Sequence, residues 1–331
     1  MSNDSSDYDT WDYSEDLMTT DTDLEIIRTC NLFFVIVGCF GNLNIIHATR
    51  KNSGIQHKCG ILLAILAFCD TTCLLHEFQS FIRMTLKLEA TSQIKCFYAN
   101  IIYVFIEPFE VYMILTLAID RLIAINFSVL YRTMSKKKYI IVMVTPGLFI
   151  GTLFLTWSYV NLSDTIMVDT CVLPYAMPDL VSYWWNQYNL WGAIGTMAMY
   201  FYTYMVVYCC TFKQKNEKNM IIQKAILNTV IVGAAVFSIS SVLSATLIAI
   251  FTNMTDPPID PDTISTYAVI PGLISYSCNF YVYFWRSTDY RTAFVKQLCC
   301  GRVLATQESL VSTAPRSSMA SKKSSTVLVV R

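Results

Sequence analysis

The chain has 331 residues, of which 54% are hydrophobic and 15% charged, and its 24 basic and 24 acidic residues give a formal net charge of zero. Soluble domains carry roughly 25% charged residues, so this composition excludes an ordinary soluble domain and favours a protein built for lipid. We expect the lipid bilayer, and not nucleic acid, as its environment.

Residues 1–25 are polar and acidic, and they contain neither a basic segment nor an early apolar core. Both features would mark a signal peptide. We therefore predict an extracellular disordered acidic N-terminus.

Seven apolar stretches follow, each about the ~20 residues that cross a bilayer as a helix. They cover residues 26–48, 60–81, 99–125, 139–160, 184–212, 220–251 and 264–285. This pattern predicts an all-α membrane protein, a seven-transmembrane-helix bundle over residues 26–285. A short amphipathic helix on the inner leaflet is expected at 286–300, before a Ser/Thr-rich, disordered cytoplasmic tail at 301–331.

Basic residues gather in one set of loops, at 50–58, 132–138, 213–224 and 286–302. Cytoplasmic loops carry the excess of Lys and Arg. The N-terminus is therefore expected outside and the C-terminus inside, as an odd number of spans requires, in the plasma membrane.

Twelve cysteines are present, and only Cys96 and Cys171 fall clearly in outside segments. Because the outside is oxidising, these two are expected to form a disulfide. The alternative is a pair of unpaired, buried cysteines.

Short motifs occur at fixed places on these spans. "DRL" begins with Asp120 and Arg121, about one membrane thickness after Cys96. "GN" ends at Asn42 on the first span, "LAFCD" ends at Asp70 on the second, and "NFYVY" runs from Asn279 to Tyr283 on the seventh. In this order the motifs resemble those of rhodopsin-like G-protein-coupled receptors, and the sequence around them is most similar to nematode serpentine chemoreceptors of class Srsx.

The resemblance implies that Asp120, Arg121 and Tyr283 serve G-protein coupling, with the arginine held by its acid at rest and turned inward on activation. The alternative is an interfacial pair that only anchors the helix end. Since the pair lies at the cytoplasmic edge, loss of Arg121 is expected to leave no deeply buried partner. Phe280 departs from the family pattern, which has proline there, and neither the fifth nor the sixth span contains proline. Kinks are therefore not assumed in these helices.

Helical spacing places one stripe of the third span toward the bundle: Tyr103, Glu107, Glu110, Ile114, Leu117 and Arg121. On the second span, Asp70 and Glu77 share a face. Ionisable residues inside a membrane are functional candidates, although protonated or hydrogen-bonded structural acids are the alternative.

A central polar pocket is implied by the resemblance, and in many receptors it holds a sodium ion. Its members here are Asn42, Asp70, Glu110, Ser275 and Asn279. Two carboxylates sharing a low-dielectric site require a proton or a cation, so a sodium ion at Asp70 is the only cofactor considered. The sequence leaves proton and sodium open.

The candidate ligand pocket comprises Tyr103, Glu107, Glu77 and His76. The seventh span has no lysine, which excludes a retinal pigment, and Tyr103 stands where an amine receptor usually has Asp. An aromatic set, Trp184, Trp185, Tyr188 and Trp191, reads more readily as an interfacial belt than as a ligand cage. The ligand, a small molecule or a peptide, stays open; the acidic outer surface favours cations such as basic peptides.

Past the seventh span, Tyr290, Ala293, Phe294 and Leu298 share one side of the predicted amphipathic helix. Cys299 and Cys300 follow it and are candidate palmitoylation sites, with free thiols as the alternative.

We therefore interpret the chain as a chemosensory G-protein-coupled receptor of a sensory-cell membrane, with a heterotrimeric G protein as partner. It shows no nucleophile–base set or phosphate loop, so no enzyme is expected. A neuropeptide receptor is the alternative within the class. An ion- or proton-coupled transporter using the intramembrane carboxylates is the alternative outside it, although the sequence has no inverted repeat.

Overall fold

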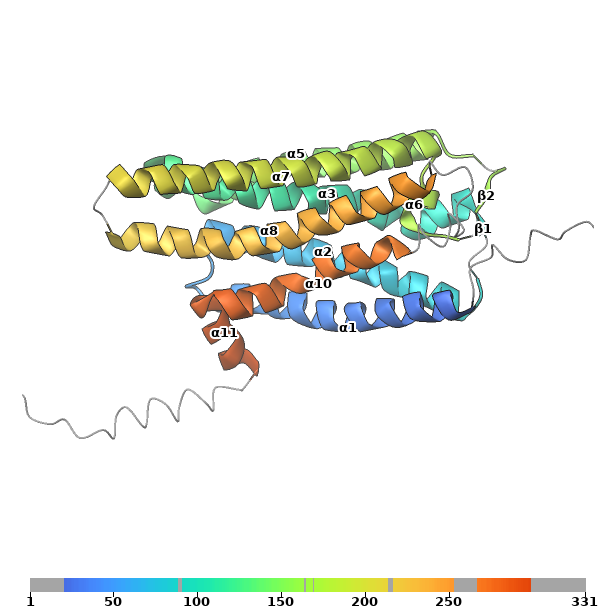
Figure 1. Cartoon of the computed structure of the whole chain (residues 1–331), viewed down its shortest axis with the longest axis horizontal. Helices are drawn as coiled ribbons and strands as arrows, with labels where there is room; N and C mark the ends of the chain where they lie inside the picture. The colour runs from blue at the N-terminus through green and yellow to red at the C-terminus, as the bar shows by residue number, and fades with distance from the viewer. Residues whose placement is uncertain are drawn as a thin grey trace, which may run out of the picture.

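The computed structural model describes residues 21–88, 91–163, 165–168, 170–213, 217–252 and 267–298. Seven long helices run side by side along a common axis (Figure 1). They are α1 (Asp21–Lys51), α2 (Lys58–Thr85), α3 (Gln93–Asn126), α5 (Lys136–Val160), α7 (Asp179–Lys213), α8 (Glu217–Thr252) and α10 (Val269–Arg286). Three short helices connect or follow them: α4 (Ser128–Thr133), α6 (Leu173–Ala176) and α11 (Thr288–Leu298).

Within the described residues, six helices are long and apolar enough to cross a membrane, namely α1, α2, α3, α5, α7 and α8. The predicted seventh span, 264–285, begins in a stretch outside the description, and α10 covers its remainder with 18 residues. Most of the predicted N-terminal segment and the whole segment 301–331 also lie outside the described residues, while α1 already begins at Asp21.

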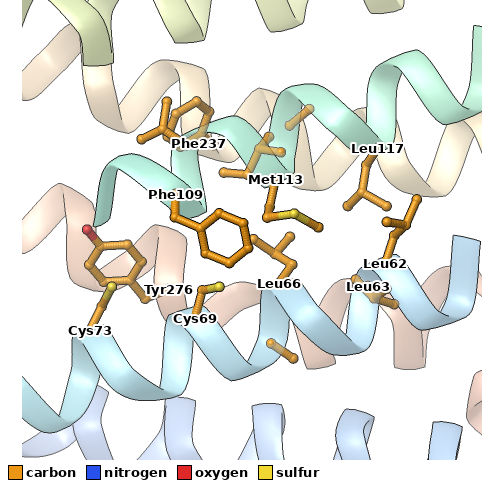
Figure 2. Close-up of a cluster of buried hydrophobic side chains, with 14 of the residues drawn as sticks. Leu62, Leu63, Leu66, Cys69, Cys73, Phe109, Met113, Leu117, Phe237 and Tyr276 are labelled. Atoms are coloured by element: carbon orange, nitrogen blue, oxygen red, sulfur yellow. The ribbon is translucent and has the colours of Figure 1, made fainter. Parts of the chain in front are cut away.

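Helix α3 lies at the centre, in contact with α2, α5, α7 and α8. All six members of its predicted stripe are buried, which confirms the orientation derived from spacing. Figure 2 shows Phe109, Met113 and Leu117 of α3 packed toward Leu62 and Leu66 of α2. Because lipid is as apolar as these side chains, close packing and interhelical hydrogen bonds hold such helices together.

Helix α1 approaches α10 closely at Gly41. A Cβ atom at this position would lie 2.6 Å from Cβ of Phe280, so only glycine fits. The Phe280 ring in turn packs 4.5 Å, centroid to centroid, from that of Phe294 on α11. The residue that replaces the family's proline therefore joins α1, α10 and α11.

Two short strands lie at the end of the bundle opposite α11 (Figure 1). β1 (Thr91–Ser92) pairs antiparallel with β2 (Met167–Val168), in the register Thr91 to Val168. The all-α prediction missed this pair because two-residue strands carry no hydrophobic period. The same end holds α6 and the disulfide.

The predicted amphipathic side of α11 packs largely on protein. Tyr290, Ala293 and Phe294 are buried, and the Tyr290 ring lies 5.1 Å from that of Tyr283 on α10. Leu298, assigned to the same side, is exposed. It lies at the end of the helix, beyond the contacts with α1 and α10.

Candidate functional site

The half of the bundle that carries the disulfide and α6, called the outer half from here on, contains a cavity of about 110 Å³. Its walls come from α2, α3, α6, α7, α8 and α10, so six elements close it. Three carboxylic acids line it, Glu77 of α2 and both Glu107 and Glu110 of α3, and all three are buried. The opposite walls carry Trp185 and Asn189 of α7, Ser240 and Ser241 of α8 and Tyr276 of α10, while Leu173 and Pro174 of the α6 segment cover it.

Neutral groups hold two of these acids. The Tyr103 hydroxyl donates a 2.7 Å hydrogen bond to Glu77 Oε1, and Trp185 Nε1 donates to Glu107 Oε2. Glu110 Oε2 is buried and has no hydrogen-bond partner among the described residues. Each acid therefore lies in the cavity wall without a basic side chain to neutralise it.

Three of the four predicted ligand-pocket residues, Tyr103, Glu107 and Glu77, line this cavity. His76 does not; its ring stacks on Tyr103, with centroids 5.4 Å apart and an interplanar angle of 15°. The structure thus gathers these residues around one tyrosine, with His76 behind it.

The aromatic set on α7 divides into two pairs. Trp184 and Trp191 are 51% and 66% exposed, as expected for an interfacial belt. Trp185 lines the cavity, and the Tyr188 hydroxyl donates a 3.0 Å hydrogen bond to the carbonyl of Pro108. One assignment for all four was therefore too coarse, since a helix turns neighbouring side chains to different faces.

A polar cluster lies deeper in the bundle. Asp70 accepts a 2.8 Å hydrogen bond from Asn279 Nδ2, and its carboxyl group lies close enough to that of Glu110 for the two to interact electrostatically. Neither Asp70 Oδ1 nor Glu110 Oε2 accepts a hydrogen bond from any donor in the described part of the chain. Asn42 lies at the back of this region, where its Nδ2 donates to the Tyr276 carbonyl at 2.9 Å.

Ser275 connects the two regions. It lines the outer cavity and also a smaller one of about 20 Å³, the size of a single water molecule. Asn279 and Tyr283 line the smaller cavity from α10. The two cavities therefore share Ser275 and Phe237 as wall residues.

The oxygen-rich composition of this cluster suits a hard cation such as sodium. No group of three or more His, Cys, Asp and Glu side chains in the described ranges could hold a metal ion. An ion here would thus rely on two carboxyl groups and on neutral oxygens.

At the inner end of α3, Arg121 forms an ion pair with Asp120. Arg121 Nε donates to Asp120 Oδ2 at 3.0 Å, and the Tyr139 hydroxyl of α5 donates to Asp120 Oδ1 at 2.8 Å. Loss of Arg121 was predicted to leave no deeply buried partner. That expectation is wrong: Asp120 is 0% and Arg121 3% exposed, and Tyr131 of α4 and Tyr139 of α5 lie against them.

A second cation, Lys58, lies under the same cover. It is buried, donates to the Tyr131 carbonyl and lies 4.5 and 4.8 Å from the ring centroids of Tyr131 and Tyr139. Burial, followed by the charge of Asp120, raises the pKa of Tyr131, so its hydroxyl stays neutral and accepts a 3.3 Å hydrogen bond from Arg121. Lys58 had been counted only as a basic loop residue.

Tyr283, the third residue assigned to G-protein coupling, packs on Tyr290 and lines the small cavity. The hydrogen bonds that the structure gives Arg121 go to Asp120 and Tyr131. Cys299 and Cys300 lie outside the described residues.

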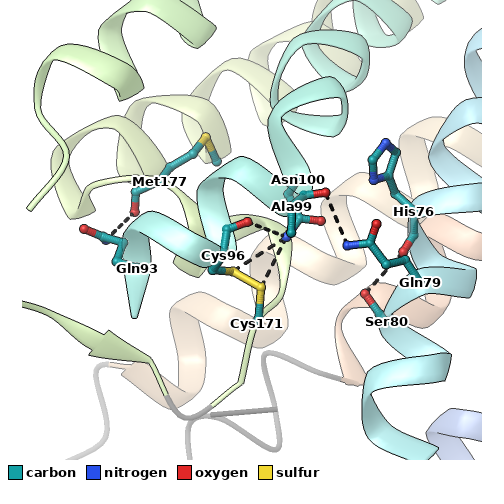
Figure 3. The surroundings of a disulfide bond; sticks show 9 residues. All are labelled: His76, Gln79, Ser80, Gln93, Cys96, Ala99, Asn100, Cys171 and Met177. Atoms are coloured by element: carbon teal, nitrogen blue, oxygen red, sulfur yellow. Dashed lines mark hydrogen bonds between the residues drawn. A yellow bond between two sulfur atoms is a disulfide. The ribbon is translucent and has the colours of Figure 1, made fainter. Parts of the chain in front are cut away.

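The predicted disulfide is confirmed. Cys96 and Cys171 are joined, with an S–S distance of 2.04 Å, and tie the segment before α6 to the outer end of α3. Figure 3 shows Asn100 Nδ2 directed at both sulfur atoms, with 3.3 Å to Cys171 Sγ. This bond fixes the segment that covers the cavity.

Four functional candidates escaped the sequence reasoning: Lys58, Tyr131, Tyr139 and Trp185. Each acts through contacts between helices far apart in the chain, and none belongs to a motif. None of them left a usable signal in the sequence, and Trp185 in particular is not separated from Trp184, because Tyr188 lies within about one helical turn of both.

Comparison with known families gives a match over residues 35–298, more than half of the chain, to the family described as serpentine type 7TM GPCR chemoreceptor Srsx. No curated protein matches the sequence. The matched family consists of receptors and not of enzymes, and its match agrees with the apolar helices of a multi-pass membrane protein. The chain belongs to the serpentine 7TM GPCR chemoreceptor family Srsx.

Proposed function

We propose that this chain is a chemosensory G-protein-coupled receptor that passes ligand binding in the outer cavity to a heterotrimeric G protein at the inner end of α3. The observation that carries the proposal is the buried Asp120–Arg121 pair, covered by Tyr139 and Tyr131. A buried ion pair is costly to form, and it becomes useful when a second state exposes the arginine to a partner.

The topology proposed for this function places α10 as the seventh span, the N-terminus outside, and the receptor in the plasma membrane of a sensory cell. In support, the disulfide lies at one end of the bundle and the basic loops around Lys58 and Arg132 at the other. α11 then lies along the inner leaflet, packed on α10 by Tyr290 and Phe294. Its far end, Leu298, is exposed and available to lipid.

Signalling requires two states whose populations the ligand shifts. In the resting state Asp120 and Tyr131 hold Arg121, and Lys58 holds α4 through the Tyr131 carbonyl. An activated state separates Arg121 from these partners and opens the inner end. The ligand acts by binding that state more tightly.

Asp70, Glu110 and Ser275 are the residues proposed to hold a sodium ion or a proton. Such a cation neutralises the paired carboxyl groups and so favours the resting packing. Sodium chloride is then expected to raise the melting temperature of the receptor more than the chloride of a bulky organic cation. Asp70→Asn should remove the difference, and an equal response in wild type and variant would leave the cluster as a neutral hydrogen-bonded core.

The test of the main proposal is nucleotide exchange by purified G proteins on the full-length receptor in lipid nanodiscs. The wild type should accelerate basal exchange on at least one G-protein class, Asp120→Asn should raise the rate, and Arg121→Gln should abolish it. Arg132→Gln, an exposed change on α4, is the matched control. No acceleration with any class would overturn the proposal.

The transporter alternative is tested by measuring ion uptake after the same purified protein is reconstituted into liposomes. Uptake of sodium or protons that depends on Asp70 or Glu107, without any nucleotide exchange, would favour the transporter. Exchange without uptake favours the receptor.

A further inference from the structure

We infer that the outer cavity binds a small organic cation, an amine carried as its ammonium ion, with Glu110 as the primary anchor. The inference rests on the proposed function in that it assigns the ligand class of the same receptor site. It starts from the imbalance of charge in the cavity wall, where three acids meet no base. None of the lining residues that the structure describes is Lys, Arg or His.

The acids are held in different ways, and this difference selects the anchor. Glu77 accepts from the Tyr103 hydroxyl and Glu107 from Trp185 Nε1, so each already has a neutral donor. Glu110 Oε2 has no donor in the described part of the chain, although the side chain is only 1% exposed and lines the cavity. A buried acceptor without a donor is costly, and an ammonium group brings both three N–H donors and the missing charge.

Size favours an organic ligand over an inorganic ion or a whole peptide. A cavity of about 150 Å³ holds a benzene ring, so this one, at about 110 Å³, suits an organic group smaller than benzene. It is far larger than a sodium ion and far smaller than a folded peptide. Leu173 and Pro174 of the disulfide-tied segment cover it, which also limits entry of a chain.

The remaining walls fit the same chemistry. Tyr103, Trp185 and Tyr276 present aromatic groups to the cavity, and the ring faces of Trp and Tyr attract cations, most strongly in desolvated sites. Ser240 and Ser241 supply hydroxyl groups on α8, across from α3, for a polar substituent of the ligand. His76, the nearest imidazole on α2, stacks behind Tyr103 and does not line the cavity.

Glu110 also connects the ligand with the deeper cluster, because its carboxyl group interacts electrostatically with that of Asp70. An ammonium ion on Glu110 replaces the proton or cation that the two carboxyl groups otherwise share. The charge of the ligand therefore influences Asp70, and its hydrogen bond with Asn279, through the single side chain of Glu110. A neutral ligand of the same shape lacks this effect.

Thermal stabilisation of the full-length receptor in nanodiscs measures binding without a G protein, since a ligand that binds only the folded state raises its melting temperature. The probes are butylamine and ethanolamine, each beside the alcohol and carboxylate of matched shape, at up to about 10 mM to detect millimolar affinity. We expect at least one amine to stabilise the wild type and its matched alcohol and carboxylate to do so far less.

Glu110→Gln keeps the shape and removes the charge, so it should weaken amine binding about 10- to 100-fold. The matched control, Asp179→Asn, removes one exposed charge from the outer end of α7 and should leave the affinity unchanged. If Glu110→Gln does not fold, Glu107→Gln takes its place, with a smaller loss expected because Trp185 also holds that acid.

Three results would overturn the inference: no amine stabilises the wild type, the matched alcohol or carboxylate stabilises it equally, or Glu110→Gln and Asp179→Asn lose affinity to the same extent. Nucleotide exchange in the same nanodiscs separates this inference from the proposed function. Amine binding without exchange on any G protein would sink the receptor proposal and leave the cation site standing. Exchange driven by neutral or anionic probes would overturn the cation site and leave the receptor proposal standing.

Discussion

Both halves of α3 bury charged side chains, and the two halves compensate them differently. At the inner end Asp120 has Arg121 as counter-ion, and Lys58 lies under the rings of Tyr131 and Tyr139. In the outer half Glu77, Glu107 and Glu110 meet only neutral donors or none. The charges of the inner set balance without a ligand, whereas the acids of the outer set have no basic partner. In the receptor proposed above, the inner set holds the resting state and the outer set receives the ligand.

The largest effect should come from breaking the inner pair. Arg121→Ala leaves Asp120 buried with Tyr139 as its remaining donor, and removal of one partner of a buried pair costs about 3–5 kcal/mol. We expect a lower melting temperature and reduced surface level, together with loss of nucleotide exchange. The measurements are surface labelling and thermal melting, with exposed Arg132→Ala as the matched control.

The double change Asp120→Asn with Arg121→Gln sharpens the same prediction. It removes both charges and should restore the surface level while exchange stays lost. A normal surface level for Arg121→Ala alone would show that Asp120 can reach water, contrary to the burial described here.

Next in size is the covalent tie at the outer end. Cys171→Ser should lower the free energy of unfolding by about 2–4 kcal/mol, since residues separated by 75 positions are no longer linked. Amine stabilisation should weaken as well, because the cover of the cavity is released. Thermal melting with and without ligand measures both effects, and Cys30→Ser, a free cysteine on α1, is the control.

Lys58→Met should have an intermediate effect. It removes a desolvated cation from two aromatic rings, an interaction worth about 2 kcal/mol, and frees the Tyr131 carbonyl. We expect raised basal exchange because α4 holds Arg121 less firmly, with Lys58→Arg closer to wild type. Exposed Lys137→Met is the control, and unchanged basal exchange in Lys58→Met would argue against a part for Lys58 in the resting state.

The smallest effect is expected from Tyr103→Phe in the outer half. The change removes the hydroxyl that donates to Glu77, a loss of about 1 kcal/mol in stability. Amine affinity should change little, since Glu110 is the anchor. Tyr98→Phe, an exposed site on the same helix, serves for comparison in thermal melting and ligand titration. A tenfold loss of affinity would shift the anchor from Glu110 to Glu77.

Sequence reasoning was sufficient where a feature follows from local periodicity or from compartment chemistry. The buried stripe of α3 follows from steps of three and four, and the Cys96–Cys171 bond from the oxidising outside. It failed for Lys58 and for Trp185, whose positions depend on how helices rotate against one another. Hydropathy shows that a segment crosses the membrane but not which direction each side chain takes at its ends. The β1–β2 pair was missed for a related reason, because its partners lie far apart in the chain.

Phe280 has a mechanical consequence. Its ring is wedged between Gly41 of α1 and Phe294 of α11, so rotation of α10 about its own axis must carry α11 with it. Figure 1 shows α11 turned away from the axis of the bundle at the end of α10, so a rotation of α10 would swing it about that ring. An arm of 11 residues is about 16 Å long, and a rotation of about 10° displaces its tip by about 3 Å. A small rotation of α10 would thus produce its largest displacement at Leu298, the far end of α11.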